Sequence, residues 1–471
     1  MAVPDALRRL PSLRVTAPQA TTRPPRPERG QELDLRVDAL AFGGRGVARH
    51  EGFVLFVQGA IPGDRVRAVV TKRKRGYGEA RLTEVLEPSA QRIAPVADHP
   101  GAPWQVLPYE RQLAVKQEQV ADALARIGHL EGFVLDDIVP AVEQWRYRNK
   151  FEYSFGTDDE GGLVCGFHAP GSWERIEPLD DCLLATQRGN AAREQVLAWA
   201  RDQGLGARDR RTREGLLRNL VVREGRRTGE LQVRLVVSSS HAADVDVDSL
   251  ERAVDCDSLL LTRTDAVGES TSVGEHELVG GAAKLHEELS GLRFAISPTA
   301  FFQTNTEMAE RLYAVAGEHA ALQGWERLFD LFCGIGTVGL SIGGRAGELW
   351  GVEVVEEAVA DAIENARDNE RTNARFFAGD VRLAMRELVE RAGRPDVLVV
   401  DPPRPGLSQK IVRRIIEASP RRIVYISCNP TTLAPNAAQL VEAGYALRRV
   451  SPVDMFPQTP HIECVALLER T

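Results

Sequence analysis

The segment from Arg327 to Gly343 constrains the fold more than any other part of the chain. It reads RLFDLFCGIGTVGLSIG, an apolar run, then a glycine-rich turn, then the start of a helix. The next apolar run, LWGVEVV, carries Glu353 near its end. Strand, turn, helix and strand in this order predict a doubly wound α/β sheet that holds a nucleotide-like ligand at the carboxyl ends of its strands. A GxG turn alone fits dinucleotide enzymes equally well.

Two further strand ends narrow this choice. ARFFAGD ends in Asp380, and DVLVVDPPRPGL places Asp401 directly before the rigid pair Pro402 and Pro403. A strand, an acidic residue and a diproline just past the sheet edge resemble the arrangement in class I S-adenosylmethionine (SAM) methyltransferases. A dehydrogenase has no use for this diproline.

A bare cysteine, Cys428, ends the apolar run IVYIS and precedes Asn-Pro and a helix. A free cysteine is most often a small buried hydrophobe. Methylation at C5 of a pyrimidine, however, needs a thiolate that adds to C6, because C5 of uracil is a poor nucleophile. Amino-group methyltransferases carry an aromatic residue after the diproline, whereas Arg404 stands there in this chain. We therefore expect Cys428 to be a nucleophile whose pKa the following helix lowers.

The segment 31–90 alternates apolar and polar residues between glycine turns, which predicts a small antiparallel barrel. One turn carries four cations and an aromatic residue, which suits an RNA backbone and a base: Lys72, Arg73, Lys74, Arg75 and Tyr77. The alternative is a solvated charged hairpin. With GGRGVAR and FVLFVQGAIPGDRV in order, the segment resembles the RNA-binding TRAM domain, and this resemblance favours RNA.

The stretch 91–295 mixes a helical segment with strand-like pieces and is expected to form a central α+β domain. In WRYRNKFEYSFG, the cations Arg146, Arg148 and Lys150 occupy alternate positions, so a strand would show them on one face. This face suits RNA, but a charged outer face over a packed inner face explains the pattern equally well.

Composition sets the remaining limits. The 471 residues are 43% hydrophobic and 27% charged, as in an ordinary globular protein of several domains. No apolar run reaches the length of a membrane span, and six scattered cysteines favour a reducing cytoplasm. A net charge of −8 alone would argue against nucleic acid, so local charge decides. Residues 1–30 are expected to be a disordered tail, and a monomer is the default.

From about residue 33 to the C-terminus, the chain resembles the RNA uridine-5-methyltransferase family. The likeness rests on FFQTN (301–305), DLFCGIGT (330–337), SCNPTTLA (427–434) and DMFPQTPHIECVALLER (454–470). It implies a Rossmann-like methyltransferase domain over 296–471, an OB-like barrel over 31–90 and an RNA substrate. It makes Cys428 the nucleophile and Glu463 the base that removes the C5 proton. The implied SAM contacts are Gln303, Phe332, Thr337, Glu353, Asp380 and Asp401.

Many relatives carry a four-cysteine iron–sulfur cluster before a segment like WQVLPYERQL. Registered on that segment, this chain has Ile93, His99 and Ala102 at three of the four positions and leaves only Cys182. One thiolate cannot hold such a cluster, so we expect no cluster and no metal. The barrel favours large-subunit rRNA over tRNA as substrate, whereas a missing cluster favours tRNA; we expect rRNA. The alternatives are an RNA-binding pseudoenzyme and a methyltransferase for another RNA base.

Each candidate also has a plainer interpretation. Cys333 and Cys464, flanked by apolar residues, are expected to be core thiols. Glu463 could form a surface ion pair and Asp401 could cap the following helix. His461 could orient Glu463 or lie in solvent.

Overall fold

The computed structural model describes residues 26–471, without the side chains of residues 243 and 244. These residues form two compact units: residues 26–41 with 45–90, and residues 42–44 with 91–471. The tail expected over residues 1–30 falls mostly on residues 1–25, which lie outside the described residues. Within residues 26–30, Gly30 donates a backbone hydrogen bond of 2.8 Å to the carbonyl of Val70 in the barrel.

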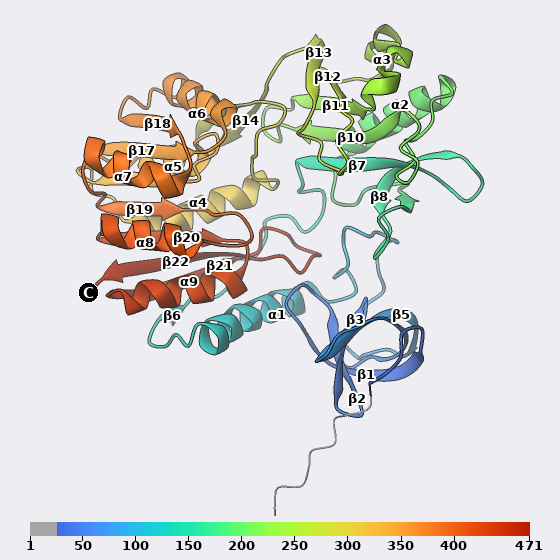
Figure 1. The fold of residues 1–471 in the computed structure, drawn as a ribbon, viewed down its shortest axis with the longest axis horizontal. Coiled ribbons are helices and arrows are strands. Elements are labelled where there is room, and N and C mark those ends of the chain that lie inside the picture. The colour runs from blue at the N-terminus through green and yellow to red at the C-terminus, as the bar shows by residue number, and fades with distance from the viewer. Residues whose placement is uncertain (1–25) are drawn as a thin grey trace, which may run out of the picture. The chain divides into compact units, whose positions relative to one another are not determined.

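The first unit is a closed barrel with strand order β1-β2-β3-β5-β4 (Figure 1). Its strands are β1 (Glu32–Leu40), β2 (Gly46–His50), β3 (Phe53–Gln58), β4 (Arg65–Arg73) and β5 (Tyr77–Glu87). Buried and exposed residues alternate along β1, so one side chain in two fills the interior, as expected for a small barrel. The predicted barrel is confirmed, although β3 and β5 pair in parallel.

The second unit contains a central seven-stranded sheet of order β13-β12-β11-β10-β7-β8-β9. Its elements are β7 (Lys150–Thr157), β8 (Leu163–His168), β9 (Ile176–Pro178), α2 (Gln187–Asp202), β10 (Leu217–Glu224), β11 (Leu231–Val237), η2 (Ser239–Asp244), α3 (Val247–Ala253), β12 (Ser258–Arg263) and β13 (Glu275–Gly281). The strand predicted to carry Arg146, Arg148 and Lys150 on one face begins only at Lys150. Arg146 instead has a left-handed backbone (φ 56°), so the predicted alternation is wrong.

The C-terminal sheet has eight strands in the order β18-β17-β16-β19-β20-β22-β21-β6. Five of them run parallel to one another: β16 (Arg327–Leu331), β17 (Glu348–Glu353), β18 (Ala374–Ala378), β19 (Val397–Val400) and β20 (Arg422–Ser427). The antiparallel strand β22 (Glu463–Arg470) pairs with β20 and with β21 (Tyr445–Val453). This topology confirms the doubly wound α/β fold.

Helices cover both faces of this sheet (Figure 1). One core is shared by the sheet with α4 (Thr306–Ala320), α5 (Thr337–Ile342) and α6 (Glu356–Asp368). The core on the other face includes α7 (Val381–Ala392), α8 (Gln409–Ala418) and α9 (Pro430–Glu442). A short 3-10 turn, η3 (Gly343–Arg345), follows α5.

A segment from the first part of the second unit completes the C-terminal sheet. Strand β6 (Val134–Leu135) pairs in parallel with β21, and Val120 of α1 (Tyr109–Asp122) lies in the same core as α9. The π-helical turn η1 (Ala123–Ile127) follows α1 directly and leads to β6. The residues before the central sheet therefore belong structurally to the C-terminal sheet.

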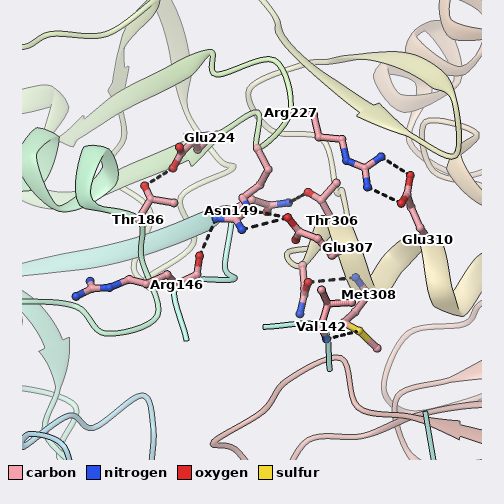
Figure 2. Close-up of polar contacts among 12 residues, drawn as sticks. Val142, Arg146, Asn149, Thr186, Glu224, Arg227, Thr306, Glu307, Met308 and Glu310 are labelled. Atoms are coloured by element: carbon pink, nitrogen blue, oxygen red, sulfur yellow. Dashed lines mark hydrogen bonds and ion pairs between the residues drawn. The ribbon is translucent and has the colours of Figure 1, made fainter. Parts of the chain in front are cut away.

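The hairpin of β14 (Leu285–Leu289) and β15 (Leu292–Ile296) leads from the central sheet to α4. Figure 2 shows the polar contacts that join residues around the central sheet to α4 and to the loop before it. The Asn149 side chain donates to the Gln303 carbonyl (3.0 Å) and to the Thr306 hydroxyl (2.9 Å), and Arg227 pairs with Glu310 of α4. These contacts fix the loop before α4, which carries Gln303.

Candidate active site

The residues with expected catalytic and cofactor roles gather at one edge of the C-terminal sheet. Strands β16 to β20 run parallel, so their carboxyl ends meet at this edge, and antiparallel β22 begins there. The residues at or just after these strand termini are Phe332, Glu353, Asp380, Asp401, Cys428 and Glu463. One chemistry-bearing side chain stands at each strand terminus, as in ligand sites of open α/β sheets.

Glu463 is the buried acid of this edge. It begins β22 opposite Val453, and the next residue, Cys464, pairs with Ser427, so Glu463 lies beside the end of β20 that carries Cys428. Its side chain is only 4% exposed, which excludes the surface ion pair. Burial first, and then the charge of Asp401, raise its pKa well above the usual range.

Cys428 lies half-buried between β20 and α9, whose N-cap is Asn429. Burial raises the pKa of the Cys428 thiol to about 11, and the nearby carboxyl groups of Glu463 and Asp401 add to this shift. Arg404 opposes it. For the free protein the pKa shift is therefore opposite in direction to the predicted one, because desolvation and the nearby carboxyl groups dominate it.

Asp401, Asp380 and His461 differ in whether the structure supports a plainer role for them. Asp401 does not cap α8, because Ser408 does, and burial raises the pKa of Asp401 to about 7. Asp380 caps α7 by accepting the Arg382 backbone N–H (2.8 Å). His461 is exposed and its ring packs edge-on against Phe456.

Cys333 and Cys464 are confirmed as core thiols, because their side chains are 3% and 0% exposed. Burial raises the pKa of both well above the usual range, so neither competes with Cys428 as a nucleophile.

The glycine turn after β16 provides an open surface for a cofactor. Gly334 has φ +53° and no atom within 4 Å of the position a Cβ would take, so a ligand can approach its backbone. Its N–H donates to the Glu353 carboxylate at 3.2 Å. The hydroxyl of Thr337, the first residue of α5, contacts the Tyr313 hydroxyl at 3.2 Å.

Sequence reasoning missed two charged residues of this site. Asp330 is completely buried in β16; its Oδ2 accepts the Gly339 N–H (2.8 Å), and its Oδ1 has no partner among the described residues. Burial raises its pKa to about 8. Arg404 acts electrostatically on both Cys428 and Glu463. The available signals were an aspartate inside an apolar run and a cation directly after the diproline.

The cations expected to bind RNA have different surroundings. The four cations from Lys72 to Arg75 are exposed at the end of β4 and in the turn after it, and Tyr77 packs edge-on against Phe56 with 38% of its surface exposed. Arg146 is engaged by Asp181 and by two carbonyl groups.

The other two cations of the central segment are also partly engaged. Arg148 lies over the Phe151 ring, and Lys150 pairs with Glu152 at 2.6 Å. Both line a cavity of about 540 Å³ with the exposed side chain of Phe301.

The residues at the expected cluster positions do not fit an iron–sulfur cluster. His99 Nε2 lies 3.3 Å from Cys182 Sγ with both side chains buried, so the register derived from the sequence brings these two positions together. Ile93 is 45% exposed and Ala102 offers no ligand atom. No group of three or more His, Cys, Asp or Glu side chains among residues 26–471 is arranged to hold a metal ion. The absence of a cluster stays a prediction.

Comparison with known proteins decides the family. Residues 284–471 match the family described as tRNA (Uracil-5-)-methyltransferase, and residues 26–83 match the TRAM domain. An uncharacterized RNA methyltransferase of Halalkalibacterium halodurans is 36% identical over 454 residues, which cover 93% of this chain and 96% of the relative. One from Caldanaerobacter subterraneus is 37% identical, with 94% and 100% covered. This chain belongs to the RNA uracil-5-methyltransferase family.

A solved structure agrees with this membership. The Pyrococcus abyssi tRNA (uracil-54, C5)-methyltransferase in complex with S-adenosyl-L-homocysteine superposes with a TM-score of 0.76 and 27% identity, over 92% of this chain and 99% of that one. The expected enzyme class is confirmed: this RNA uracil-5-methyltransferase uses SAM as its cofactor and RNA as its substrate. No helix within residues 26–471 is long and apolar enough to cross a membrane.

Proposed function

We propose that the enzyme methylates C5 of a uridine in structured RNA through a covalent bond between Cys428 Sγ and C6 of the base. The observation that carries this proposal is the meeting of Cys428 and Glu463 at the strand ends. A half-buried thiol and a buried carboxyl group lie at neighbouring strand ends, with Asp401 and Arg404 close enough to shift their pKa values. The target base leaves its stack to reach them.

The cofactor residues proposed are Gln303, Phe332, Thr337, Glu353, Asp380 and Asp401. The open backbone at Gly334 and the unpaired Oδ1 of Asp330 support a polar ligand at this edge. Glu353 ends β17, where an acidic residue takes ribose hydroxyls in folds of this type. When bound there, SAM supplies an electrophilic methyl group on a positively charged sulfur.

The chain's own groups perform the remaining chemistry. The Cys428 thiol loses its proton to solvent water, and the thiolate forms the S–C6 bond while the C5=C6 electrons move toward the C4 carbonyl. This makes C5 nucleophilic toward the methyl group. The ionised Glu463 carboxylate then takes the C5 proton, C5=C6 forms again and the S–C6 bond breaks. A buried carboxylate with a raised pKa is a strong base for this step.

Trapping the adduct tests both roles. Cys428→Ala should abolish turnover and adduct, whereas Glu463→Gln should methylate once and stall with RNA attached. The expected result is a protein–RNA band that survives denaturing electrophoresis with Glu463→Gln and carries label from the methyl group of SAM. The double variant should lose the band. Normal turnover by Glu463→Gln without a trapped adduct would show that another group removes the proton.

The target RNA has two candidates. The barrel favours large-subunit rRNA, the substrate expected from the sequence. The Pyrococcus abyssi relative, which acts on uracil 54 of tRNA, favours tRNA, and its match over 92% of this chain weakens the barrel as an argument for rRNA. Mass-spectrometric mapping of 5-methyluridine in tRNA and rRNA from a deletion strain separates the two. Loss from tRNA alone would exclude rRNA.

We further propose that the enzyme works as a monomer in the cytoplasm. Of the expected division into 1–30, 31–90, 91–295 and 296–471, we keep the boundaries except that α1 and β6, within 91–295, pack with the C-terminal sheet. The proposed nucleophile, base and cofactor residues all come from one chain, so the site needs no second copy. All six cysteines are free thiols, which suits a reducing compartment.

Arg146, Arg148 and Lys150 stay proposed RNA contacts together with the four cations of the barrel. Arg148 and Lys150 have the better support, because they line the cavity that also exposes Phe301. A cation beside an exposed ring suits a phosphate and a base.

A further inference from the structure

A second cavity lies on the central sheet, whereas the proposed catalytic residues lie on the C-terminal sheet. Its volume is about 370 Å³. It is lined by the segment Ala207–Arg211, which joins α2 to β10, by Gly156 and Thr157 at the end of β7, and by Glu174. Three of these residues are arginines, so the cavity is rich in cations.

Arg208 is the unusual member of the cavity wall. Its side chain is enclosed, with the residue only 9% exposed, and its Nε has no hydrogen-bond partner among the described residues. No carboxylate among the described residues pairs with Arg208, whereas the two other arginines of the cavity, Arg210 and Arg211, are both paired. A buried N–H without an acceptor is costly, because its lost hydration is not replaced. An anion that enters the cavity would supply the missing acceptor and a counterion for Arg208.

The carboxylates around the cavity already have other partners. Glu269 pairs with Arg210 at 3.0 Å, and Glu174 pairs with Arg211 at 2.6 Å. Asp209 accepts the backbone N–H groups of Arg211 and Thr212, both at 2.7 Å, and so closes its own turn.

Two neighbours extend the site beyond Arg208. The Arg211 side chain is 72% exposed, so its ion pair is weak in water and the guanidinium can turn toward an incoming anion. Trp173, directly before Glu174, exposes 60% of its surface. An exposed aromatic ring one residue from the wall of a cation-rich cavity suits RNA, because the cations can bind a phosphate while the ring stacks an unpaired base.

We propose that a phosphodiester of the RNA substrate binds in this cavity as the counterion of Arg208, and that an adjacent unpaired base stacks on Trp173. This inference rests on the proposed function only in taking RNA as the ligand. It gives the enzyme an RNA contact on the central sheet that is separate from the methyl-transfer site, so it contributes affinity and register without touching the reacting base.

Arg208→Gln tests this contact, with Arg252→Gln as the matched control because Arg252 is an exposed arginine on helix α3, which packs in the core of the central sheet. RNA binding is measured by filter retention across a salt series without SAM. We expect Arg208→Gln to weaken binding about tenfold at low salt and to reduce the salt slope by about one. The KM for RNA should rise while kcat stays unchanged. Arg252→Gln should bind as the parent does.

The melting temperature of Arg208→Gln shows whether this variant folds. If it does not fold, a second variant, Trp173→Ala, tests the proposal. Trp173→Ala should weaken binding to the same RNA without changing the salt slope. RNA should quench the tryptophan fluorescence of the parent more than that of this variant, which keeps the other five tryptophans. Parental affinity and slope in a folded Arg208→Gln, or no loss with Trp173→Ala, would overturn the proposal. Inorganic phosphate that raises the parent's melting temperature through Arg208 but is not displaced by RNA would assign the cavity to a free anion and also overturn it.

These outcomes are independent of the catalytic proposal. Cys428→Ala should be inactive and yet bind RNA with the parent's dependence on Arg208, because the cavity is on another sheet. If Cys428→Ala remained active, the catalytic assignment would fail while the binding result still stood.

Discussion

At the scale of single residues, the site contains several buried acidic groups whose protonated, neutral forms are favoured. Asp330, Asp401 and Glu463 all have raised pKa values because burial disfavours their ionised forms, and the Cys428 thiol follows the same rule. The thiolate needed for attack is therefore scarce in the free enzyme. RNA and SAM therefore meet four acidic groups whose raised pKa values favour their neutral forms.

The alkylation rate of Cys428 should report this raised pKa. Only the thiolate reacts with iodoacetamide, so the rate should rise about tenfold per pH unit from pH 7 to 10, as the thiol approaches its pKa of about 11. Asp401→Asn removes one nearby negative charge and should speed the reaction at fixed pH, whereas Arg404→Gln should slow it. Mass spectrometry of the Cys428 peptide measures the rate, with Cys428→Ala as background. A rate that is flat above pH 7 would contradict the raised pKa.

Asp330→Asn should raise the free energy of unfolding and lower the methyl-transfer activity. The unfolded carboxyl loses its proton near pH 3.8, but the native group keeps it to about pH 8, so the free energy of unfolding falls as pH rises between these values. Asparagine keeps an acceptor for the Gly339 N–H and carries no charge. The variant should gain on the order of 2 kcal/mol at pH 8 and little at pH 4, while methyl transfer falls. Urea unfolding at both pH values measures this; an equal change at pH 4 and pH 8 would exclude the titration of Asp330.

At the scale of elements, helix α1 positions the loop that leads to Glu463. Lys116 Nζ donates to Asp454 Oδ1 (2.5 Å) and to the Phe456 carbonyl (3.0 Å), and both charged side chains are completely buried. Tyr109 donates to the other oxygen of Asp454 at 2.8 Å. The loop between β21 and β22 thus depends on a helix far away in the sequence.

Lys116→Met should leave Asp454 buried without its cation and cost about 3–5 kcal/mol of stability. Activity should fall with it, since the loop before Glu463 loses its anchor. Adding Asp454→Leu removes the second charge and should recover much of the stability but not the activity. The control is Arg111→Gln on the same helix, whose partly exposed pair with Glu118 should be worth less than about 1 kcal/mol. Urea unfolding gives the four values; a double variant no more stable than Lys116→Met would exclude a buried-charge penalty.

At the scale of the whole molecule, an acidic chain binds RNA through local groups of cations. The net charge is −8, yet four consecutive exposed cations stand where β4 of the barrel ends. Alanine at Lys72, Arg73, Lys74 and Arg75 together should weaken RNA binding and lower its salt slope by up to about 3, because fewer counterions are released. SAM affinity, measured by calorimetry, should stay unchanged. If the fourfold variant kept the parent's RNA affinity and salt slope, the hairpin would be a solvated loop without a role in RNA binding.

The sequence by itself determined the barrel, the doubly wound sheet and the acidic strand ends. Those features are written in local patterns, because alternation sets the buried face of a strand, and in parallel strands a residue that follows an apolar run lies at the carboxyl edge. The sequence therefore placed Asp401 and Cys428 at one edge without any knowledge of distant contacts. The resemblance to a family added Glu463, whose own surroundings gave a weaker signal.

Only the tertiary structure decided what depends on partners far away in the chain. Lys116 and Asp454 are 338 positions apart. Arg146 lies in a left-handed turn against Asp181 instead of on a strand, and Arg208 has no such partner among the described residues. The raised pKa of Cys428 is the clearest case, because desolvation and the charges of Glu463 and Asp401 arise only when three strand termini meet. Burial and long-range electrostatics are properties of the packed molecule, and no local pattern encodes them.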